Sequence, residues 1–558
     1  MQPGNATASN NLGNILRTKR RFAEAEVLYR SSMAQHPSYV LLQLNLGRVL
    51  VEQSRSEEAI QIFRAALELA PGNVELRTAL AGALSIRKHY VEAAVLLRQL
   101  GNWAELQSVL RWLADWSQLA RVDTALLQQL GQDPALRPSP WGMINVPELT
   151  AAQHRDIGYR YASHWWAAAL KSMPLQVEPP SGEKLRVGYL SCDFFDHATL
   201  HLLIGVLEAH DQERVEIHLF DHSPVREDAF TRRLAASGLR RHELNALSDE
   251  AAARLISEQR LHILVDIKGY TTGARLGICA YRPAPVLVSW LGYPGSLGHP
   301  RLADYIIGDE TVTPPEHSAH FSETLALLPH CYQPNDRHRP IAVAPSRSAA
   351  GLPESGVVLC SFNQVLKLNP REFDIWCLLL EKVPDSVLWL LDPEVEETRS
   401  NLRREMSQRG IDTSRLLFAP RLLQAEHLAR LSLADLALDS FPCTSHTTAS
   451  DALWVGLPMV ARLGETFASR VSSSLLRAHG FAELVAKDEA DYVEKLLVLA
   501  TSFEQRAALR TRLMAARMTS PLFDTLGFTR DLEALYEAIW ADRGRAKSSG
   551  TVVRAVQL

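Results

Sequence analysis

The stretch Asp439-Ser-Phe-Pro-Cys-Thr-Ser-His-Thr-Thr-Ala-Ser-Asp-Ala-Leu-Trp-Val-Gly-Leu-Pro458 has the pattern of a strand end, a turn and a hydroxyl-rich helix start. Ser445, Thr447 and Thr448 can cap a helix that opens near His446. In such a helix start the backbone N–H groups, the hydroxyls and the positive end of the helix dipole would face one point, which favours a phosphate.

Two interpretations of this helix start are open. Asp451 lies one turn further along and could accept hydrogen bonds from a ribose, which would make the start part of a nucleotide site. The alternative is an ordinary capped helix, whose polar residues satisfy only the N–H groups of its own first turn. The rest of the chain has to decide between them.

Length and composition indicate a soluble globular protein. The chain has 558 residues, of which 46% are hydrophobic and 22% charged, and this predicts about three domains with substantial cores. The formal net charge is −4, and charges of both signs are mixed along the chain. Because no basic surface is indicated, the composition argues against a nucleic-acid partner.

Cysteine usage and the N-terminus indicate the compartment. The six cysteines are scattered and include no Cys-x-x-Cys pair, which argues against both a zinc site and a disulfide framework. The first residues lack a basic segment followed by an apolar run, and the chain has no stretch of about 18 uncharged apolar residues. We therefore expect a cytoplasmic protein without a membrane segment.

The N-terminal part contains a repeat with a spacing of 34 residues. The matching positions are Leu12, Gly13, Leu16, Ala25, Tyr29 and Pro37, then Leu46, Gly47, Leu50, Ala59, Phe63 and Pro71, with a degenerate third copy at Leu80, Leu84, Ala93 and Leu97. This is the tetratricopeptide pattern, in which small residues let two helices approach and large ones fill the space to the next pair. Such a solenoid offers a groove for peptides, so the repeat predicts a protein partner.

Composition shifts divide the chain further. We predict tetratricopeptide repeats over 1–100, a helical connector over 101–182, a first α/β half over 183–345, a second α/β half over 346–545 and a loose tail over 546–558. The expected strands are 184–191, 215–220, 262–267, 286–291 and 305–307, then 357–362, 387–391, 416–418, 436–438 and 459–461. Their uninterrupted apolar character is typical of parallel sheets covered on both faces, and two such doubly wound halves bind ligands in the cleft between them.

These segments together resemble the O-linked N-acetylglucosaminyltransferase family, which consists of inverting glycosyltransferases of the GT-B fold. The stretches that carry the resemblance are 191–197 (SCDFFDH), 262–275 (HILVDIKGYTTGAR), 282–285 (RPAP), 290–295 (WLGYPG), 362–364 (FNQ) with Lys367, 386–391 (SVLWLL), 446–448 (HTT) with Asp451, and 464–470 (GETFASR). They span most of the chain in the family's order. The resemblance implies that the helix start at 445–448 binds the diphosphate of a UDP-sugar.

The resemblance also implies roles for single residues. Sugar transfer must neutralise the leaving diphosphate, and because the chain has no Asp-x-Asp motif we expect Lys367 and the helix start to do so without a metal or cofactor. The remaining donor-site positions match the family at Gln364 on the Lys367 loop, at His427 and Arg430 beside the uracil, at His446, Thr447, Thr448 and Asp451, and at Leu291, Gly292 and Pro294 near the sugar. Two positions depart from the animal pattern: Gln424 replaces a lysine near the ribose, and Leu366 replaces a tyrosine.

His197 is the expected catalytic residue on the acceptor side. It precedes a helix whose N-terminus disfavours an imidazolium, so the neutral ring would be available as a base. By resemblance it is either the general base for a Ser or Thr hydroxyl or a group that positions the acceptor.

The sequence thus predicts a protein O-glycosyltransferase that uses UDP-N-acetylglucosamine. The first alternative is a Spindly-type enzyme that transfers fucose from a GDP-sugar. The second is a scaffold that binds peptide but has lost turnover.

Overall fold

The computed structural model describes residues 5–182, 184–544 and 551–555. The described residues form two compact units, one from 5–133 with Ala246–Ala252 and the other from the described residues of 134–245 and 253–555. Among the described helices we find none with the length and apolar character needed to cross a bilayer.

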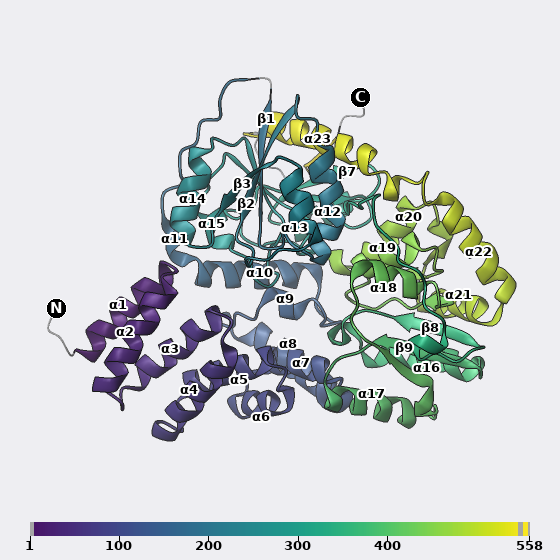
Figure 1. The fold of residues 1–558 in the computed structure, drawn as a ribbon, viewed down its shortest axis with the longest axis horizontal. Coiled ribbons are helices and arrows are strands. Elements are labelled where there is room, and N and C mark those ends of the chain that lie inside the picture. Colours follow the sequence, from purple (N-terminus) through teal and green to yellow (C-terminus); the bar gives the residue numbers. More distant parts are fainter. Residues whose placement is uncertain (1–4, 183, 545–550, 556–558) are drawn as a thin grey trace. The chain divides into compact units, whose positions relative to one another are not determined.

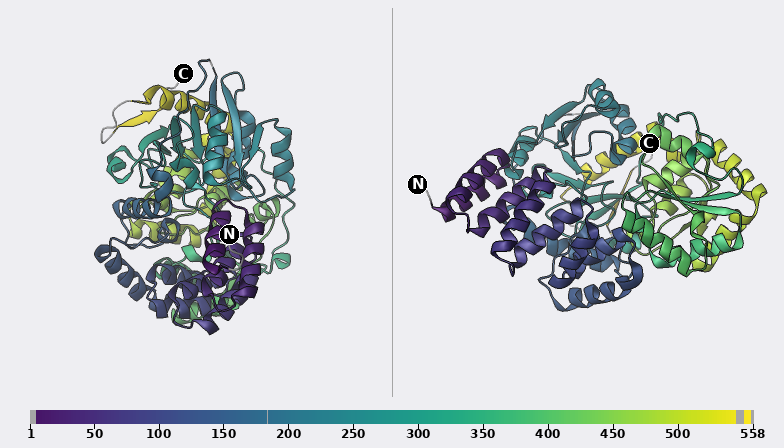
Figure 2. Two further views of the ribbon diagram at one scale, coloured as in Figure 1. Left: turned by 90° about the vertical axis from the view of Figure 1, so that its left-hand side faces the viewer. Right: turned by 60° about the horizontal axis from the view of Figure 1, so that its bottom comes forward.

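The first unit is built from successive helical hairpins, drawn in purple to blue (Figures 1 and 2). Its helices are α1 (Ala6–Thr18), α2 (Phe22–Gln35), α3 (Val40–Glu52), α4 (Ser56–Leu69), α5 (Val74–Ile86), α6 (Tyr90–Leu100), α7 (Trp103–Leu113) and α8 (Leu119–Gln132), with the short η1 (Trp116–Gln118). The hairpin of α7 and α8 continues the repeats, so residues 101–133 of the expected connector belong to the solenoid unit.

The repeat glycines are required by close packing within each hairpin. A Cβ added at Gly13 would lie 2.4 Å from the ring of Tyr29, and one added at Gly47 would lie 2.2 Å from the ring of Phe63. The large ring of the second helix therefore fills the space left by the glycine of the first helix of its own pair. Both rings are fully buried, which explains why the small and large positions recur together.

The second unit begins with short helices and an eight-stranded sheet. Its helices are α9 (Pro140–Met143), α10 (Ala151–Trp165), α11 (Ala167–Lys171), α12 (Ala198–Ala209), α13 (Ala229–Ala236), α14 (Asp249–Glu258), α15 (Leu276–Ala280) and η2 (Pro315–His320). Its strands are β1 (Leu185–Ser191), β2 (Val215–Asp221), β3 (Arg240–Glu243), β4 (Ile263–Asp266), β5 (Val286–Ser289), β6 (Tyr305–Asp309), β7 (Thr324–Leu328) and β14 (Val552–Arg554). The order is β14-β7-β6-β5-β4-β1-β2-β3, with every pairing parallel.

The second half has a smaller parallel sheet of order β10-β9-β8-β11 and a parallel pair β12-β13. Its strands are β8 (Val357–Ser361), β9 (Ser386–Leu391), β10 (Leu416–Ala419), β11 (Leu436–Ala437), β12 (Ala461–Arg462) and β13 (Val485–Ala486). Its α-helices are α16 (Pro370–Lys382), α17 (Glu396–Gln408), α18 (Gln424–Leu431), α19 (Thr447–Trp454), α20 (Val471–Ala478), α21 (Glu489–Thr501) and α22 (Phe503–Ala516). The 3-10 turns are η3 (Ser348–Ala350), η4 (Val365–Lys367), η5 (Thr413–Arg415), η6 (Phe467–Ser469), η7 (Ala482–Leu484) and η8 (Pro521–Phe523).

The C-terminal segments return to the first sheet, which corrects the expected boundaries. Helix α23 (Thr525–Asp542) packs on α12 and β7 rather than on the second half (Figure 1). Buried polar contacts fix it there: the Tyr536 and Tyr189 hydroxyls lie 2.9 Å apart, and Glu533 Oε1 lies 2.9 Å from His210 Nδ1. Part of the expected loose tail is likewise ordered as β14, which pairs with β7, whereas 545–550 and 556–558 lie outside the described residues.

Candidate functional site

The start of α19 has no side-chain cap, which corrects the expected capping by Ser445, Thr447 and Thr448. The N-cap position is His446, and no side chain there accepts a hydrogen bond from the first turn. The intrahelical pattern begins with the N–H groups of Ala449 and Ser450, both bonded to the His446 carbonyl. Among the described residues the N–H groups of Thr447 and Thr448 have no acceptor, so the helix presents two donors and its positive end.

The hydroxyls near this helix are held by a residue that sequence reasoning missed. Asn363, just after β8, donates through Nδ2 to Ser445 Oγ at 2.7 Å and accepts at Oδ1 from Thr448 Oγ1 at 3.0 Å. Asp439 adds a second anchor, because its Oδ1 accepts the Ser445 N–H at 2.7 Å. Asn363 lies inside the FNQ stretch, so its position at a strand's C-terminal end was the available signal.

Lys367, which follows the end of β8, also lies beside the start of α19. It is the last residue of η4, the turn that follows β8, and its Nζ donates to the Thr444 carbonyl at 2.8 Å. The ammonium group therefore lies beside the turn that leads into α19. Gln364 opens η4, is exposed, and makes no side-chain cap bond there. The predicted pairing of Lys367 with the helix start is thus found in the structure.

His446 is held as a neutral ring. Burial and the neighbouring Lys367 ammonium lower the pKa of His446 to about 3, and its Nε2 lies 3.3 Å from the Ala468 carbonyl. Ala468 also lines a cavity of about 20 Å³ together with Tyr293, Pro294 and His154. The structure thereby places the 291–294 loop next to the 446–448 helix start.

The 291–294 loop needs its glycine for a reason other than ligand contact. A Cβ added at Gly292 would lie 2.4 Å from the Ile267 carbonyl oxygen, so the loop packs closely on the segment that follows β4. Leu291 adopts a positive φ of 71°. His154 faces the neighbouring cavity, and burial lowers its pKa to about 4. Sequence reasoning missed His154, which has no distinguishing pattern around it.

His427 and Arg430 lie together on α18, but their side chains differ in exposure. Arg430 is 3% exposed and donates through Nη2 to His427 Nδ1 at 2.9 Å, with its guanidinium 4.5 Å from the centroid of the Phe362 ring. Burial is the main cause that lowers the pKa of His427 to about 3. Because Nδ1 accepts this bond, the ring proton of neutral His427 is on Nε2, and that atom faces Asp451 Oδ2 at 4.0 Å. The guanidinium of Arg430 thus holds the Nδ1 side of the His427 ring.

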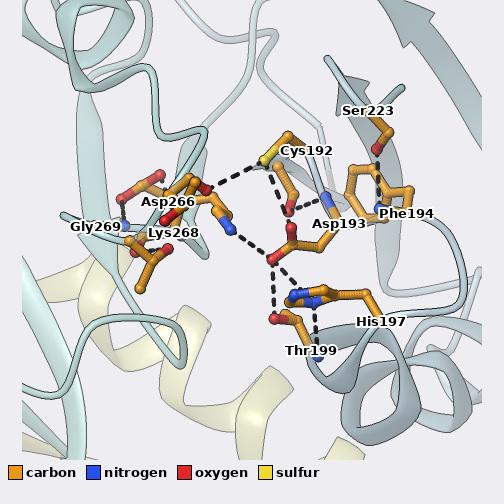
Figure 3. A network of polar contacts seen from close by, with 12 residues as sticks. Cys192, Asp193, Phe194, His197, Thr199, Ser223, Asp266, Lys268 and Gly269 are labelled. Carbon is orange, nitrogen blue, oxygen red and sulfur yellow. Dashed lines mark hydrogen bonds and ion pairs between the residues drawn. The ribbon is translucent and has the colours of Figure 1, made fainter. Parts of the chain in front are cut away.

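A second polar network, next to the ends of β1 and β4, is centred on Asp193, which the sequence analysis does not single out (Figure 3). Its Oδ2 accepts from Lys268 Nζ at 2.7 Å and from Thr199 Oγ1 at 2.9 Å, and lies 3.3 Å from His197 Nδ1. Lys268 and Asp193 are both buried, and they follow the neighbouring strands β4 and β1. Asp266 orders the lysine's turn by accepting the Gly269 N–H at 2.7 Å.

The two contacts of His197 Nδ1 favour opposite tautomers. The Thr199 N–H donates to Nδ1 at 3.2 Å, which leaves the ring proton on Nε2, whereas a bond to Asp193 requires the proton on Nδ1. Only the second tautomer has a free Nε2 lone pair that can accept a proton. Burial, opposed by Asp193 and reinforced by Lys268, lowers the pKa of His197, so the ring is neutral at pH 7. The prediction of a neutral His197 at a helix start is therefore supported, with burial as the main cause.

The described residues include no group of three or more His, Cys, Asp or Glu side chains arranged to hold a metal ion. That observation leaves the predicted metal independence untested.

Comparison with known proteins defines the class. A sequence model of glycosyl transferase family 41 matches residues 167–341 and 333–532, and tetratricopeptide models match 10–74 and 50–111. The chain therefore belongs to glycosyl transferase family 41, which confirms the predicted resemblance.

Individual relatives agree with this assignment. The chain is 33% identical over 452 residues to the probable UDP-N-acetylglucosamine–peptide N-acetylglucosaminyltransferase SEC of Arabidopsis thaliana, covering 78% of this chain and 46% of that protein. It is 30% identical over 403 residues to the corresponding probable enzyme SPINDLY of Solanum lycopersicum, covering 69% and 42%. The chain thus spans less than half the length of these curated relatives.

A solved structure confirms the fold class. A mutant of the O-GlcNAc transferase of Thermobaculum terrenum superposes with a TM-score of 0.72 at 24% identity, covering 96% of this chain and 98% of that one. The predicted solenoid followed by a GT-B pair of α/β halves is therefore confirmed.

Proposed function

We propose that this chain is an inverting, metal-independent glycosyltransferase that moves N-acetylglucosamine from UDP-N-acetylglucosamine to Ser or Thr hydroxyls of proteins. The observation that carries the proposal is the uncapped start of α19 beside Lys367. Two N–H donors with no described acceptor and one ammonium group converge there. Such fixed donors suit a diphosphate and need no reorganisation as negative charge develops on the leaving group.

The acceptor would enter from the side of the first half. Its hydroxyl oxygen forms a bond to the anomeric carbon as the bond from that carbon to the diphosphate oxygen breaks, and UDP leaves with the electron pair. The hydroxyl proton must go to a base, and His197 with Asp193 at 3.3 Å supplies a neutral imidazole for that role in the tautomer with the proton on Nδ1. Lys268 holds the Asp193 carboxylate in place, because its Nζ donates to Oδ2 at 2.7 Å.

The repeats would bring the peptide acceptor, as the names of the relatives also suggest. The relatives are named for transfer of N-acetylglucosamine to peptides, and the solenoid unit supplies the architecture that binds extended peptides. All six cysteines are free, which supports a cytoplasmic location. A donor UDP-sugar and a protein acceptor are thus the partners we propose, with no nucleic acid or membrane.

The test is transfer of labelled sugar to a library of Ser/Thr peptides from UDP-N-acetylglucosamine and, in parallel, from GDP-fucose. We expect product only from the UDP-sugar, with the rate unchanged after chelation of divalent ions. Product from GDP-fucose would favour the Spindly-type alternative. Tight UDP binding without turnover on any peptide would favour the scaffold.

A further inference from the structure

A buried ion pair joins the nucleotide-binding helix to the segment between the two α/β halves. Arg339 Nη1 donates to Asp451 Oδ1 and to Ser450 Oγ, both at 3.0 Å. The two charged side chains are only 1% and 9% exposed. Arg339 lies near the end of the segment predicted as the first α/β half, and no pattern there predicts a role in the site.

The same guanidinium contacts the point where the chain crosses between the halves. Arg339 Nη2 donates to Asn335 Oδ1, which also accepts from Ser450 Oγ at 2.5 Å. Asn335 in turn donates through Nδ2 to the Leu522 carbonyl at 3.0 Å, and its own carbonyl accepts from Thr525 Oγ1 at 2.8 Å. Residues 522 and 525 flank the return crossing into α23. Both crossings of the chain therefore meet at the Ser450–Asp451 turn of α19.

This arrangement leaves one oxygen of Asp451 available. Oδ1 is taken by Arg339, whereas Oδ2 accepts no hydrogen bond from a described residue and has His427 Nε2 at 4.0 Å. Burial raises the pKa of Asp451, and the charges of Arg339 and of His201 on α12 oppose this shift. A carboxylate fixed through one oxygen presents the other in a single direction, which suits a vicinal diol.

We propose that Arg339 is a positioning residue for the donor: it fixes Asp451 through Oδ1 so that Oδ2 accepts from the ribose hydroxyls, and it ties this contact to the crossing between the halves. The inference rests on the proposed use of a UDP-sugar. Arg339 acts on ribose recognition through Asp451. It does not act on diphosphate binding, which belongs to Lys367 and the start of α19.

The test compares binding of UDP with binding of 2′,3′-dideoxy-UDP by calorimetry. One hydrogen bond to a charged group is worth about 10-fold or more in affinity, so the wild type should prefer UDP by about that factor. In Arg339→Met the preference should fall to within about 3-fold while affinity for the dideoxy compound stays the same. Arg339→Lys keeps a positive charge beside Oδ1 and should restore most of the preference.

The unpaired buried carboxylate in Arg339→Met can prevent folding. The double variant Arg339→Met/Asp451→Asn removes that charge, and we expect it to bind UDP within about 2-fold of Asp451→Asn alone. Two results would overturn the inference but not the proposed function. One is an equal further loss of affinity for UDP and for dideoxy-UDP in the double variant, and the other is an unchanged preference for UDP in Arg339→Met. Absence of UDP binding by the wild type would overturn the proposed function as well.

Discussion

Replacing Lys367 by methionine removes the charged donor beside the start of α19 and keeps an unbranched side chain of similar size. In the structure the side chain is half-buried and its ammonium group donates to the Thr444 carbonyl at 2.8 Å. The variant loses one charge-assisted hydrogen bond of the folded state, which costs about 1.5 kcal/mol of stability for a partly exposed group. The main effect is therefore expected on the transition state, where the leaving diphosphate gains negative charge.

The size of that effect follows from the charge geometry. Two unit charges about 4 Å apart in an effective dielectric of about 20 attract each other by about 4 kcal/mol. Partial exposure of Lys367 screens some of this attraction, and loss of one fixed donor to a developing anion typically costs about 2.7–4 kcal/mol. We therefore expect kcat to fall about 10²–10³-fold, with a much smaller change in the affinity for the peptide acceptor.

The assay is single-turnover transfer of labelled N-acetylglucosamine to a peptide, with UDP binding measured separately. Lys382→Met is the matched control, because Lys382 ends α16 in the same half and its side chain is 54% exposed. The control should keep wild-type turnover. Turnover of Lys367→Met within about 3-fold of the wild type would refute the assignment of Lys367 to the leaving group.

Three further predictions concern other parts of the molecule. His197→Ala should lower turnover by about 10²–10⁴-fold with little change in UDP affinity, and near-normal turnover would remove His197 from the mechanism. Gly47→Val places side-chain atoms where Phe63 lies, since even a Cβ would be 2.2 Å from its ring, and should destabilise the solenoid unit by about 1–3 kcal/mol in urea unfolding; wild-type stability would contradict the packing argument. Burial lowers the pKa of His479 to about 4, below the unfolded value of about 6.5, so the unfolded chain binds more protons and the wild type loses stability as pH falls from about 6.5 toward 4. His479→Gln lacks this loss, so between pH 7 and pH 5 its unfolding free energy relative to the wild type should rise by about 2 kcal/mol, and a pH-independent difference would contradict a neutral buried ring.

Local sequence patterns predict much of the fold. The repeat could be predicted because Gly47 and Phe63 pack directly against each other. Many strands could be predicted because buried parallel strands are continuous apolar runs. Strands β3, β7, β13 and β14 are absent from the prediction; β3 (Arg240–Glu243) is polar and lies at the sheet edge. The return of α23 to the first sheet depends on contacts such as Tyr536 with Tyr189, far apart in sequence, which amphipathic spacing does not specify.

The site was predictable where it coincides with a strand end. Lys367 and the helix start follow β8 and β11, and the rule for parallel sheets brings them to one edge. The predicted hydroxyl caps were wrong because Asn363 binds Ser445 and Thr448 instead. Arg339 could not be foreseen, since its role depends on a fold crossing that brings it to Asp451.

The most direct test of the account is a crystal structure of the protein with UDP bound. In that structure we expect diphosphate oxygens within hydrogen-bond distance of Lys367 Nζ and of the N–H groups of Thr447 and Thr448. We also expect a ribose hydroxyl on Asp451 Oδ2. A diphosphate bound away from Lys367 and the start of α19 would contradict the central claim.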